Sequence, residues 1–250
     1  MPGRCSNMTP STDTPGARAF ASEAADLAVC IDPQRPVDSI DTLLSRCLRG
    51  ERDALQIRSW PVARRLDALI SIRLAGGVAS ESIPLHCPQC NESLEISLDL
   101  AASRPPETPE RIAFEVDGER FEARCPTGED HARWQAERPT QRGAAASLLD
   151  AATEPDDAIV AALNDALAER DPARELPVST QCPACEVGIE TVIALESRLL
   201  QAFAAEQRSW LREIAAVARS YPWSEAEIAA MPAWRRRFYL ARAADAEARR

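Results

Sequence analysis

The spacing of apolar residues along the chain predicts several amphipathic helices. Leucine, isoleucine and valine recur three and four positions apart, which places them on one face of a helix. Four segments have this spacing: residues 37–50, 60–77, 154–170 and about 196–219. Gly50 and the pair Gly76–Gly77 are suited to end the first two helices, and Pro61 is suited to the first turn of the second. The chain is therefore expected to be mostly helical, with its longest helix near the C-terminus.

Alternating apolar and polar residues predict short strands between the helices. Residues 94–100 alternate in this way, and so do both sides of Asp117–Gly118 in the stretch "RIAFEVDGERFEARC". Asp-Gly is a preferred pair in two-residue hairpin turns, so this stretch is predicted to form an antiparallel hairpin. A further strand is expected after Cys185. The fold class that follows is α+β, mostly helical, with a small antiparallel β region and a long C-terminal helix.

Two C-P-x-C motifs beside the predicted strands indicate a metal site. Cys87 and Cys90 belong to "CPQC", and Cys182 and Cys185 belong to "CPAC". A knuckle of this kind points both thiolates at one ion, and two knuckles on neighbouring hairpins form the tetrahedral four-cysteine site of a zinc ribbon. The gap between the two motifs is far longer than the roughly 15–20 residues of a compact ribbon. The ribbon is therefore expected to be split by an inserted hairpin and helices.

A site with four cysteine ligands is closed, so the predicted zinc is structural rather than catalytic. The alternatives are a degenerate site that keeps its cysteines without metal, two buried thiol pairs, and a redox role. A thioredoxin-like motif would need a βαβ context and a helix start after its first cysteine, which neither motif has. His86 and His131 are interpreted as spectators, and Cys30 and Cys47 as small core residues.

The composition bears on location and partners. The chain has 250 residues and a formal net charge of −10, a balance that makes nucleic acid an unlikely partner. It contains no apolar run long enough to span a bilayer, and its first twenty residues lack the apolar segment of a secretory signal. We expect a cytoplasmic protein without a membrane segment, in a compartment where thiols stay reduced and paired cysteines bind metal.

Common catalytic motifs are absent from the sequence. It has no glycine-rich phosphate loop, no GxSxG and no HExxH, and two histidines are few for acid–base chemistry. The loop "PTGED", residues 126–130, is the only one whose polarity resembles that of an active site. A turn followed by a helix start is the simpler interpretation, because Glu129 and Asp130 suit a helix N-terminus. We therefore expect a protein that is not an enzyme.

The order of the parts is more informative than any one motif. A helix carrying "ARRLDALISIRLAGG" precedes the first knuckle, a hairpin runs into "ARCPTGEDHARW", and the second knuckle precedes the long helix and the box "YPWSEAEIAAMPAWRRRFYL". This order resembles a family of baseplate-associated proteins from contractile phage tails and related extracellular contractile injection systems, similar to a baseplate hub or hub-assembly protein of the T-even bacteriophages. The resemblance covers roughly residues 38–240. Family members often have "RLPTG" where this chain has "RCPTG", and glycine where it has Asn91 and Glu186.

The most specific element of this resemblance is the C-terminal box: Tyr221, Pro222, Trp223, Glu227, Ile228, Met231, Pro232, Arg235–Arg237 and Tyr239. The resemblance implies a non-enzymatic baseplate component or assembly factor, whose partners are other baseplate, hub or spike proteins, and which is cytoplasmic or incorporated in a phage-tail-like particle. The candidate partner-binding residues are Trp210, Tyr221, Trp223, Ile228, Met231, Trp234, Arg236 and Tyr239. The other interpretation is that the box folds back on the protein's own core.

A seam of residues along the long helix raises the same choice. From Phe203 to Tyr221, residues at alternating steps of four and three are apolar except Gln207, which is the pattern of a helix that meets another helix. We expect this seam to dock a partner through its aromatic residues. The alternative is that it packs on the helix containing Leu66 and Leu74 and leaves only the box exposed.

Four regions summarise these predictions: a disordered segment 1–20, a helical region 21–80, a split zinc ribbon with an inserted hairpin and helices 81–195, and the long helix with the docking box 196–250. The rival function is a zinc-ribbon adaptor that binds nucleic acid or a transcription or translation partner. Residues 231–250 support it, because they contain six arginines against Asp245 and Glu247.

Overall fold

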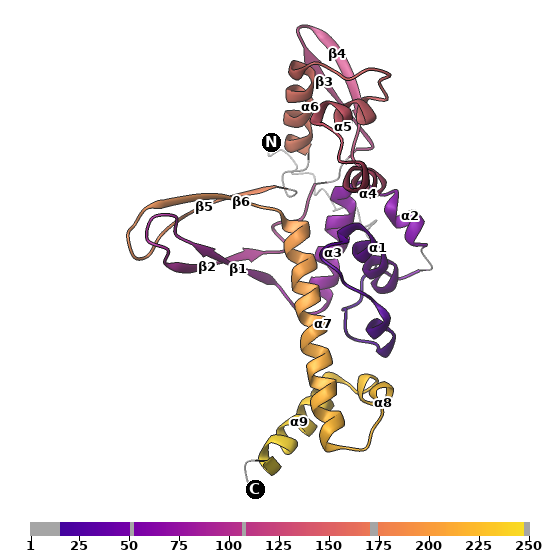
Figure 1. Ribbon diagram of the computed structural model, residues 1–250, viewed down its shortest axis with the longest axis vertical. Helices are drawn as coiled ribbons and strands as arrows, with labels where there is room; N and C mark the ends of the chain where they lie inside the picture. Colours follow the sequence, from indigo (N-terminus) through magenta and orange to yellow (C-terminus); the bar gives the residue numbers. More distant parts are fainter. Residues whose placement is uncertain (1–15, 51–52, 107–108, 171–174, 248–250) are drawn as a thin grey trace, which may run out of the picture.

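The computed structural model describes residues 16–50, 53–106, 109–170 and 175–247 (Figure 1). The protein is an elongated column of helices with an arm of two β-hairpins at its side. The long helix α7, Leu195–Ser220, runs along the lower part of the column. The strands pair only within hairpins, as three separate two-stranded antiparallel sheets. The predicted α+β class is confirmed.

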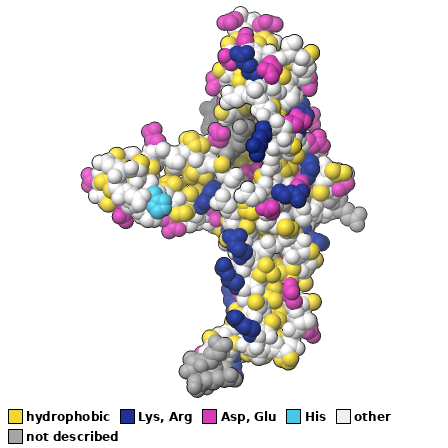
Figure 2. All heavy atoms as spheres, viewed as in Figure 1, with side chains coloured by type: hydrophobic (Ala, Val, Ile, Leu, Met, Phe, Trp, Pro, Cys, Tyr) yellow, Lys and Arg dark blue, Asp and Glu magenta, His cyan; other side chains and the backbone are white. Residues whose placement is uncertain are grey.

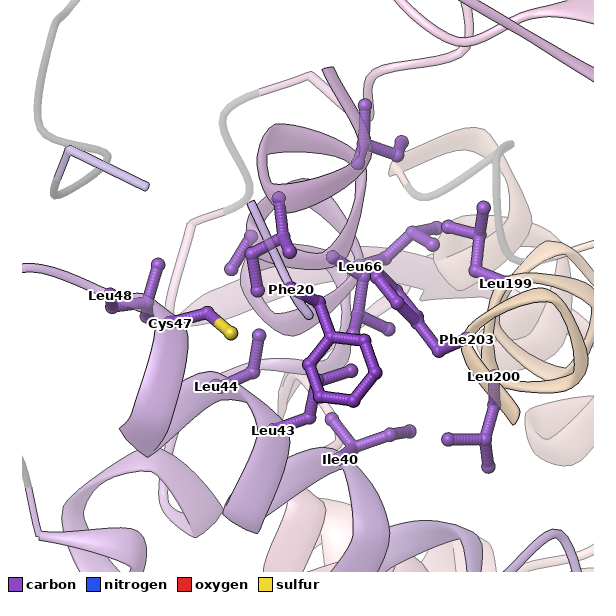
Figure 3. Close-up of a cluster of buried hydrophobic side chains, with 14 of the residues drawn as sticks. Phe20, Ile40, Leu43, Leu44, Cys47, Leu48, Leu66, Leu199, Leu200 and Phe203 are labelled. Carbon is purple, nitrogen blue, oxygen red and sulfur yellow. The ribbon is translucent and has the colours of Figure 1, made fainter. Parts of the chain in front are cut away.

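The largest hydrophobic core lies among α1 (Pro36–Cys47), α3 (Val62–Ala75) and the first half of α7, beside the short helix α2 (Ala54–Arg58). The close-up in Figure 3 shows leucine and isoleucine side chains of α1 converging with those of α7 around Phe20 and Phe203. These two rings meet edge to face, with centroids 5.9 Å apart. The helices predicted at 37–50 and 60–77 are thus confirmed, because their apolar faces line one core.

The prediction that residues 1–20 are disordered is wrong for residues 16–20. Phe20 is buried in the main core, and Ala17 forms an isolated β-bridge with Leu48. Arg18 donates to both carboxylate oxygens of Asp26, at 2.8 and 2.6 Å, beside the 3-10 helix η1 (Ala24–Ala28). One large aromatic and one buried ion pair are enough to order this stretch. The polar residues around them predict disorder when only the sequence is considered. Residues 1–15 lie outside the described residues.

The arm consists of two hairpins that flank the two cysteine motifs. β1 (Ser80–His86) pairs with β2 (Ser93–Asp99), and β5 (Leu176–Gln181) pairs with β6 (Gly188–Ile193). The strands before the knuckles, β1 and β5, contain Pro84 and Pro177, which weaken a strand prediction. Proline is tolerated here because every strand of a two-stranded sheet has one free edge. β6 continues almost directly into α7, so the arm is tied to the column at its base.

The segment between the two halves of the arm folds around a core of its own. It contains the hairpin β3 (Arg111–Val116) and β4 (Glu119–Arg124), followed by α4 (Gly128–Glu137), α5 (Gln141–Leu149) and α6 (Asp157–Arg170). Asp117 and Gly118 both have positive φ, 51° and 81°, as the predicted two-residue turn requires. Ile112, Leu148 and Leu163 are buried in this core. The predicted insertion into the ribbon is therefore an independent packing unit.

The end of the chain folds back against the second half of α7. Ser224 caps α8 (Glu225–Ala229), and the backbone amide of Ser224 donates to the carboxylate of Glu227, as in a capping box. The last helix, α9 (Ala233–Glu247), then lies beside α7 (Figure 1). Ile228 is buried together with Trp210, Ile214 and Val217 of α7.

The predicted seam of α7 is buried within the chain, so it is not a free docking surface. Phe203 packs into the main core, whereas Trp210, Ile214 and Val217 pack against α8 and α9. Gln207 donates from its side chain to the carbonyl oxygen of Val29. The intramolecular alternative holds for the seam itself, but only the N-terminal part of the seam faces α3, and the box packs against α7 instead of being left exposed.

On the face shown in Figure 2, several arginine side chains follow the lower half of the column, and acidic side chains lie at the end formed by β3 and β4 beside a few arginines. None of the helices in the described parts of the chain is both long and apolar enough to cross a membrane.

Candidate metal centre

The four predicted ligands meet at the end of the arm. The Sγ atoms of Cys87, Cys90, Cys182 and Cys185 all lie within 4.8 Å of one another. Cys87 and Cys185 have their sulfur atoms 3.6 Å apart, and so do Cys90 and Cys182, which are separated by 92 positions in the sequence. The two halves predicted from the C-P-x-C motifs thus form one cluster.

The two knuckles have the same backbone geometry. In the first, the amide of Cys87 donates to the carbonyl of Glu92 and the amide of Asn91 donates to the carbonyl of Cys87, both at 2.9 Å. In the second, the amide of Cys182 donates to Val187 and the amide of Glu186 donates to Cys182, again at 2.9 Å. A repeated backbone turn places each pair of thiols in the same relative position.

Each knuckle contains one left-handed residue immediately after its second cysteine. Asn91 and Glu186 both have φ of 59°, a left-handed conformation that favours glycine. Asparagine adopts this conformation readily, whereas for glutamate it costs roughly 1–2 kcal/mol. The second knuckle keeps the turn despite this cost, so its cysteines remain in position to act as ligands.

The sulfur separations fit a tetrahedral thiolate site. With metal–sulfur bonds of about 2.3 Å, the edges of a regular tetrahedron are about 3.8 Å long. The Cys87–Cys185 and Cys90–Cys182 pairs lie at 3.6 Å and all four sulfurs fall within 4.8 Å, so one ion can reach every ligand with small adjustments. Four soft sulfur donors in this arrangement favour zinc or an iron–sulfur centre over magnesium or calcium.

Hydrogen bonds and neighbouring sulfurs set the proton affinity of the cluster. Backbone hydrogen bonds in the turn, first that of Cys90, lower the pKa of Cys87 to about 6. The backbone of Glu92 lowers the pKa of Cys90, but the neighbouring thiols and burial outweigh it and raise that pKa to about 12. The low pKa of Cys87 favours the thiolate form that binds metal, and a bound cation would offset the repulsion that raises the pKa of Cys90.

The surroundings of the cluster are apolar on one side and open on the other. Cys87, Cys182 and Ile189 are buried, and Leu94 and Val187 pack against them. Cys90 is exposed. His86 is also exposed and does not belong to the cluster, so its interpretation as a spectator is consistent with the structure.

The loop "PTGED" connects the insertion to the helical body. The amide of Val62 donates to the carbonyl of Pro126 at 3.0 Å, and Pro61 and Thr127 form a β-bridge. Gly128 lies against Arg65, a fully buried arginine that donates to Asp41 at 2.6 Å. No sequence pattern predicts this buried Arg65–Asp41 ion pair, because an arginine on a helix is ordinarily a surface residue.

The acidic residues of this loop have structural roles at the start of α4. Thr127 and Asp130 form a capping box, and Asp130 is buried. Its carboxylate accepts hydrogen bonds from Arg124 and from Arg133, the latter at 2.7 Å. Burial raises the pKa of Asp130, but the hydrogen bonds from Arg124 and Thr127 outweigh that effect and hold the pKa below its ordinary value. The prediction of a helix start at Glu129–Asp130 is confirmed.

Most of the candidate partner-binding residues pack inside the chain. Trp210, Ile228, Met231 and Arg236 are buried, and Tyr221, Trp223 and Tyr239 form a half-buried aromatic group with Trp223 and Tyr239 at 4.6 Å between centroids. Only Trp234 of the eight is largely exposed, at 71%. The expectation of an eight-residue docking surface is therefore corrected, because seven of these residues hold the box on α7.

Arg236 explains why the box folds back. Its guanidinium lies 5.6 Å from the ring centroid of Trp210, and its Nε lies 3.6 Å from the carboxylate of Glu213. It also donates to the carbonyl of Met231, which closes the turn before α9. A buried arginine with these three contacts fixes α9 on α7, and the triple-arginine pattern alone does not single it out.

Of the two cysteines predicted to be small core residues, one is buried and the other is exposed. Cys47 is buried in the main core, as expected, but Cys30 is exposed. Cys125 is buried in the core of the insertion.

Comparison with protein-family models, curated proteins and solved structures finds no match to this chain. The assignment of a candidate metal centre, which joins the two halves of the arm, therefore depends on the positions of the four cysteine sulfurs.

Proposed function

We propose that this protein is a non-enzymatic structural or assembly component of a contractile tail or injection-system baseplate, and that a structural zinc ion on Cys87, Cys90, Cys182 and Cys185 stabilises it. The observation that carries the structural part of the proposal is the cluster of four thiols, which joins segments 92 positions apart. The contractile-system part rests on the resemblance in the order of motifs and in the C-terminal box.

The donor set supports zinc as the metal. Four cysteines at tetrahedral spacing, in two C-P-x-C knuckles, are the usual ligands of a structural zinc ion. When bound, the ion supplies a cross-link between the two hairpins and leaves no ligand position for water or substrate. The chain's own residues do the rest: the two knuckle turns preorganise the sulfurs, and Leu94, Val187 and Ile189 shield one side of them.

A structural role also agrees with how the polar residues near the middle of the chain are used. Asp130 accepts hydrogen bonds from Arg124 and Arg133 and takes part in the cap of α4, and Arg65 donates to Asp41 and packs against Gly128. Both groups stabilise the junction between the insertion and the helical body. A protein whose buried charges hold its parts together is suited to serve as a rigid component of a larger assembly.

The proposal is tested by deleting the gene in cells that make the contractile particle and complementing it. Wild-type protein should restore assembled baseplates in electron micrographs, and tagged protein should copurify with particles or with their assembly intermediates. A Cys182→Ser/Cys185→Ser variant should restore assembly poorly, and the matched variant Cys30→Ser should restore it fully. Normal particles in the deletion strain would contradict the proposed function.

A nucleic-acid adaptor is the second candidate, and one observation favours it. Arg208, Arg212 and Arg219 are exposed on the side of α7 opposite its buried seam, and among the described residues none of them pairs with a carboxylate. Such a row could contact successive phosphates. Binding of DNA or RNA that weakens steeply with salt and is lost in an Arg208→Glu/Arg212→Glu variant would support this function over the first.

A further inference from the structure

The outward face of α9 carries two large aromatic residues that the fold leaves uncovered. Trp234 and Phe238 are 71% and 56% exposed, and they lie four positions apart, on one side of the helix. The opposite side carries Arg236, Tyr239 and Leu240, which pack against α7 and its neighbours. α9 is therefore held in place by one face and presents an apolar face to solvent.

Arginines flank this apolar face. Arg235, Arg237 and Arg242 are all exposed, and one acidic side chain, Asp245, shares the outward side among the described residues. The chain as a whole has a formal net charge of −10, so the cationic border of this face is opposite in sign to the overall charge. Exposed aromatics with a cationic border fit a partner surface that is apolar in the middle and acidic at its rim.

We propose that α9 docks into an apolar groove of a partner protein, with Trp234 and Phe238 as anchors and with acidic residues of the groove pairing with Arg237 and Arg242. Anchors four positions apart are the pattern of a helix laid into a groove. A second copy of this chain fits less well, because it would place arginines against arginines. Nucleic acid and anionic lipid fit less well too, because the net charge of the chain repels both. This inference rests on the proposed function, because both require a protein partner.

The fixed position of α9 adds to the affinity that such a surface can reach. Arg236 is buried against Trp210 and Glu213, so the helix is folded and oriented before any partner arrives. A preformed helix loses less conformational entropy on binding than a segment that must fold. Trp210 of α7 and the box residues that pack against it thus act as the support, and the two exposed aromatics act as the contact.

The test uses a photo-crosslinking amino acid at position 238 of the full chain, expressed in its source cells. A second crosslinker position, 55, is the control, because Leu55 is 67% exposed on α2. The docking proposal expects one identified protein to be captured from position 238 and not from position 55. Capture should fall at least tenfold in the Arg237→Glu variant and stay unchanged in Arg208→Glu, which makes the same charge change on α7.

The captured protein is then purified and titrated with the purified chain. Trp234→Ala should weaken binding at least tenfold without changing the melting temperature, and Phe238→Ala should do the same. The inference is overturned if position 238 crosslinks to nucleic acid, to lipid or to a second copy of the chain. It is also overturned if both positions give equal adducts, or if no protein adduct forms. If the partner passes these tests but belongs to no contractile machine, the docking face stands and the proposed function fails. If the chain assembles into particles but position 238 captures nothing, the proposed function stands and the docking face fails.

Discussion

Gly128, the first residue of α4, packs directly against the buried guanidinium group of Arg65. A methyl group at Gly128 would lie 2.7 Å from Cζ of Arg65 and 2.7 Å from the carbonyl oxygen of Arg58. Neither atom can retreat easily, because Asp41 holds Arg65 and the other belongs to the backbone. Any side chain at position 128 would therefore clash with these atoms. The neighbouring residues Pro126 and Thr127 contact the start of α3 at the same place.

The first prediction concerns this contact. Gly128→Ala should lower the free energy of unfolding by about 1–3 kcal/mol, because the added methyl group overpacks the junction. Chemical denaturation monitored by circular dichroism measures the change. Gly188→Ala is the matched control, since a methyl group there meets no atom within 4 Å. Equal stability of the two variants would show that the junction is looser than described.

Breaking the cysteine cluster should destabilise the whole fold. A cross-link that closes a loop of this length stabilises a protein by roughly 3–5 kcal/mol, because it restricts the unfolded chain. Cys182→Ser removes one ligand and should clearly lower the melting temperature in calorimetry. Cys30→Ser, at an exposed cysteine outside the cluster, should leave it unchanged. A melting temperature unaffected by Cys182→Ser would argue that the cluster holds no structural metal.

The pH dependence of stability should report on Asp130. Its pKa is held below the ordinary value in the folded state, so its contribution is fully present above about pH 4, the ordinary value for aspartate, and is lost as the pH falls through the folded pKa. Asp130→Asn should therefore cost about 3 kcal/mol at pH 7 and progressively less below pH 4. The measurement is urea unfolding across pH, with the exposed Asp165→Asn as the control. A cost that is the same at every pH would contradict the assignment.

The two faces of the C-terminal box should respond differently to truncation. Ile228 is fully buried between α7 and α9, so Ile228→Ala should lower the free energy of unfolding by about 2–4 kcal/mol. Trp234→Ala removes an exposed side chain and should change it by less than about 0.5 kcal/mol. Thermal unfolding of both variants distinguishes the faces. A large loss in Trp234→Ala would place that side chain in the core and remove it as a docking anchor.

Local patterns predicted the elements whose signals lie close together in the sequence. The hairpin around Asp117–Gly118, the capping box at Ser224 and the helix from about residue 196 depend on residues only a few positions apart. The four cysteines could be paired across a long gap because both motifs have the same form and zinc needs four ligands. These features could be predicted because they depend either on interactions between residues near one another in the sequence or on the fixed number of zinc ligands.

Features that depend on tertiary contacts could not be predicted. Phe20 is buried because α1, α3 and α7 converge on it, and nothing in the polar residues around it indicates this. Arg65 and Arg236 resemble surface arginines in the sequence, although each is buried with a carboxylate partner from another part of the chain. The tryptophan and tyrosine content of the box favours a docking surface when only the sequence is considered. Those side chains instead fill the space between α7, α8 and α9.

X-ray absorption at the zinc edge, combined with metal analysis of protein purified without chelator, tests whether one zinc ion on four cysteines closes the arm. We expect one zinc per chain and four sulfur neighbours at about 2.3 Å, with no nitrogen or oxygen ligand. Well under one equivalent of zinc, or a coordination shell containing nitrogen or oxygen, would contradict it.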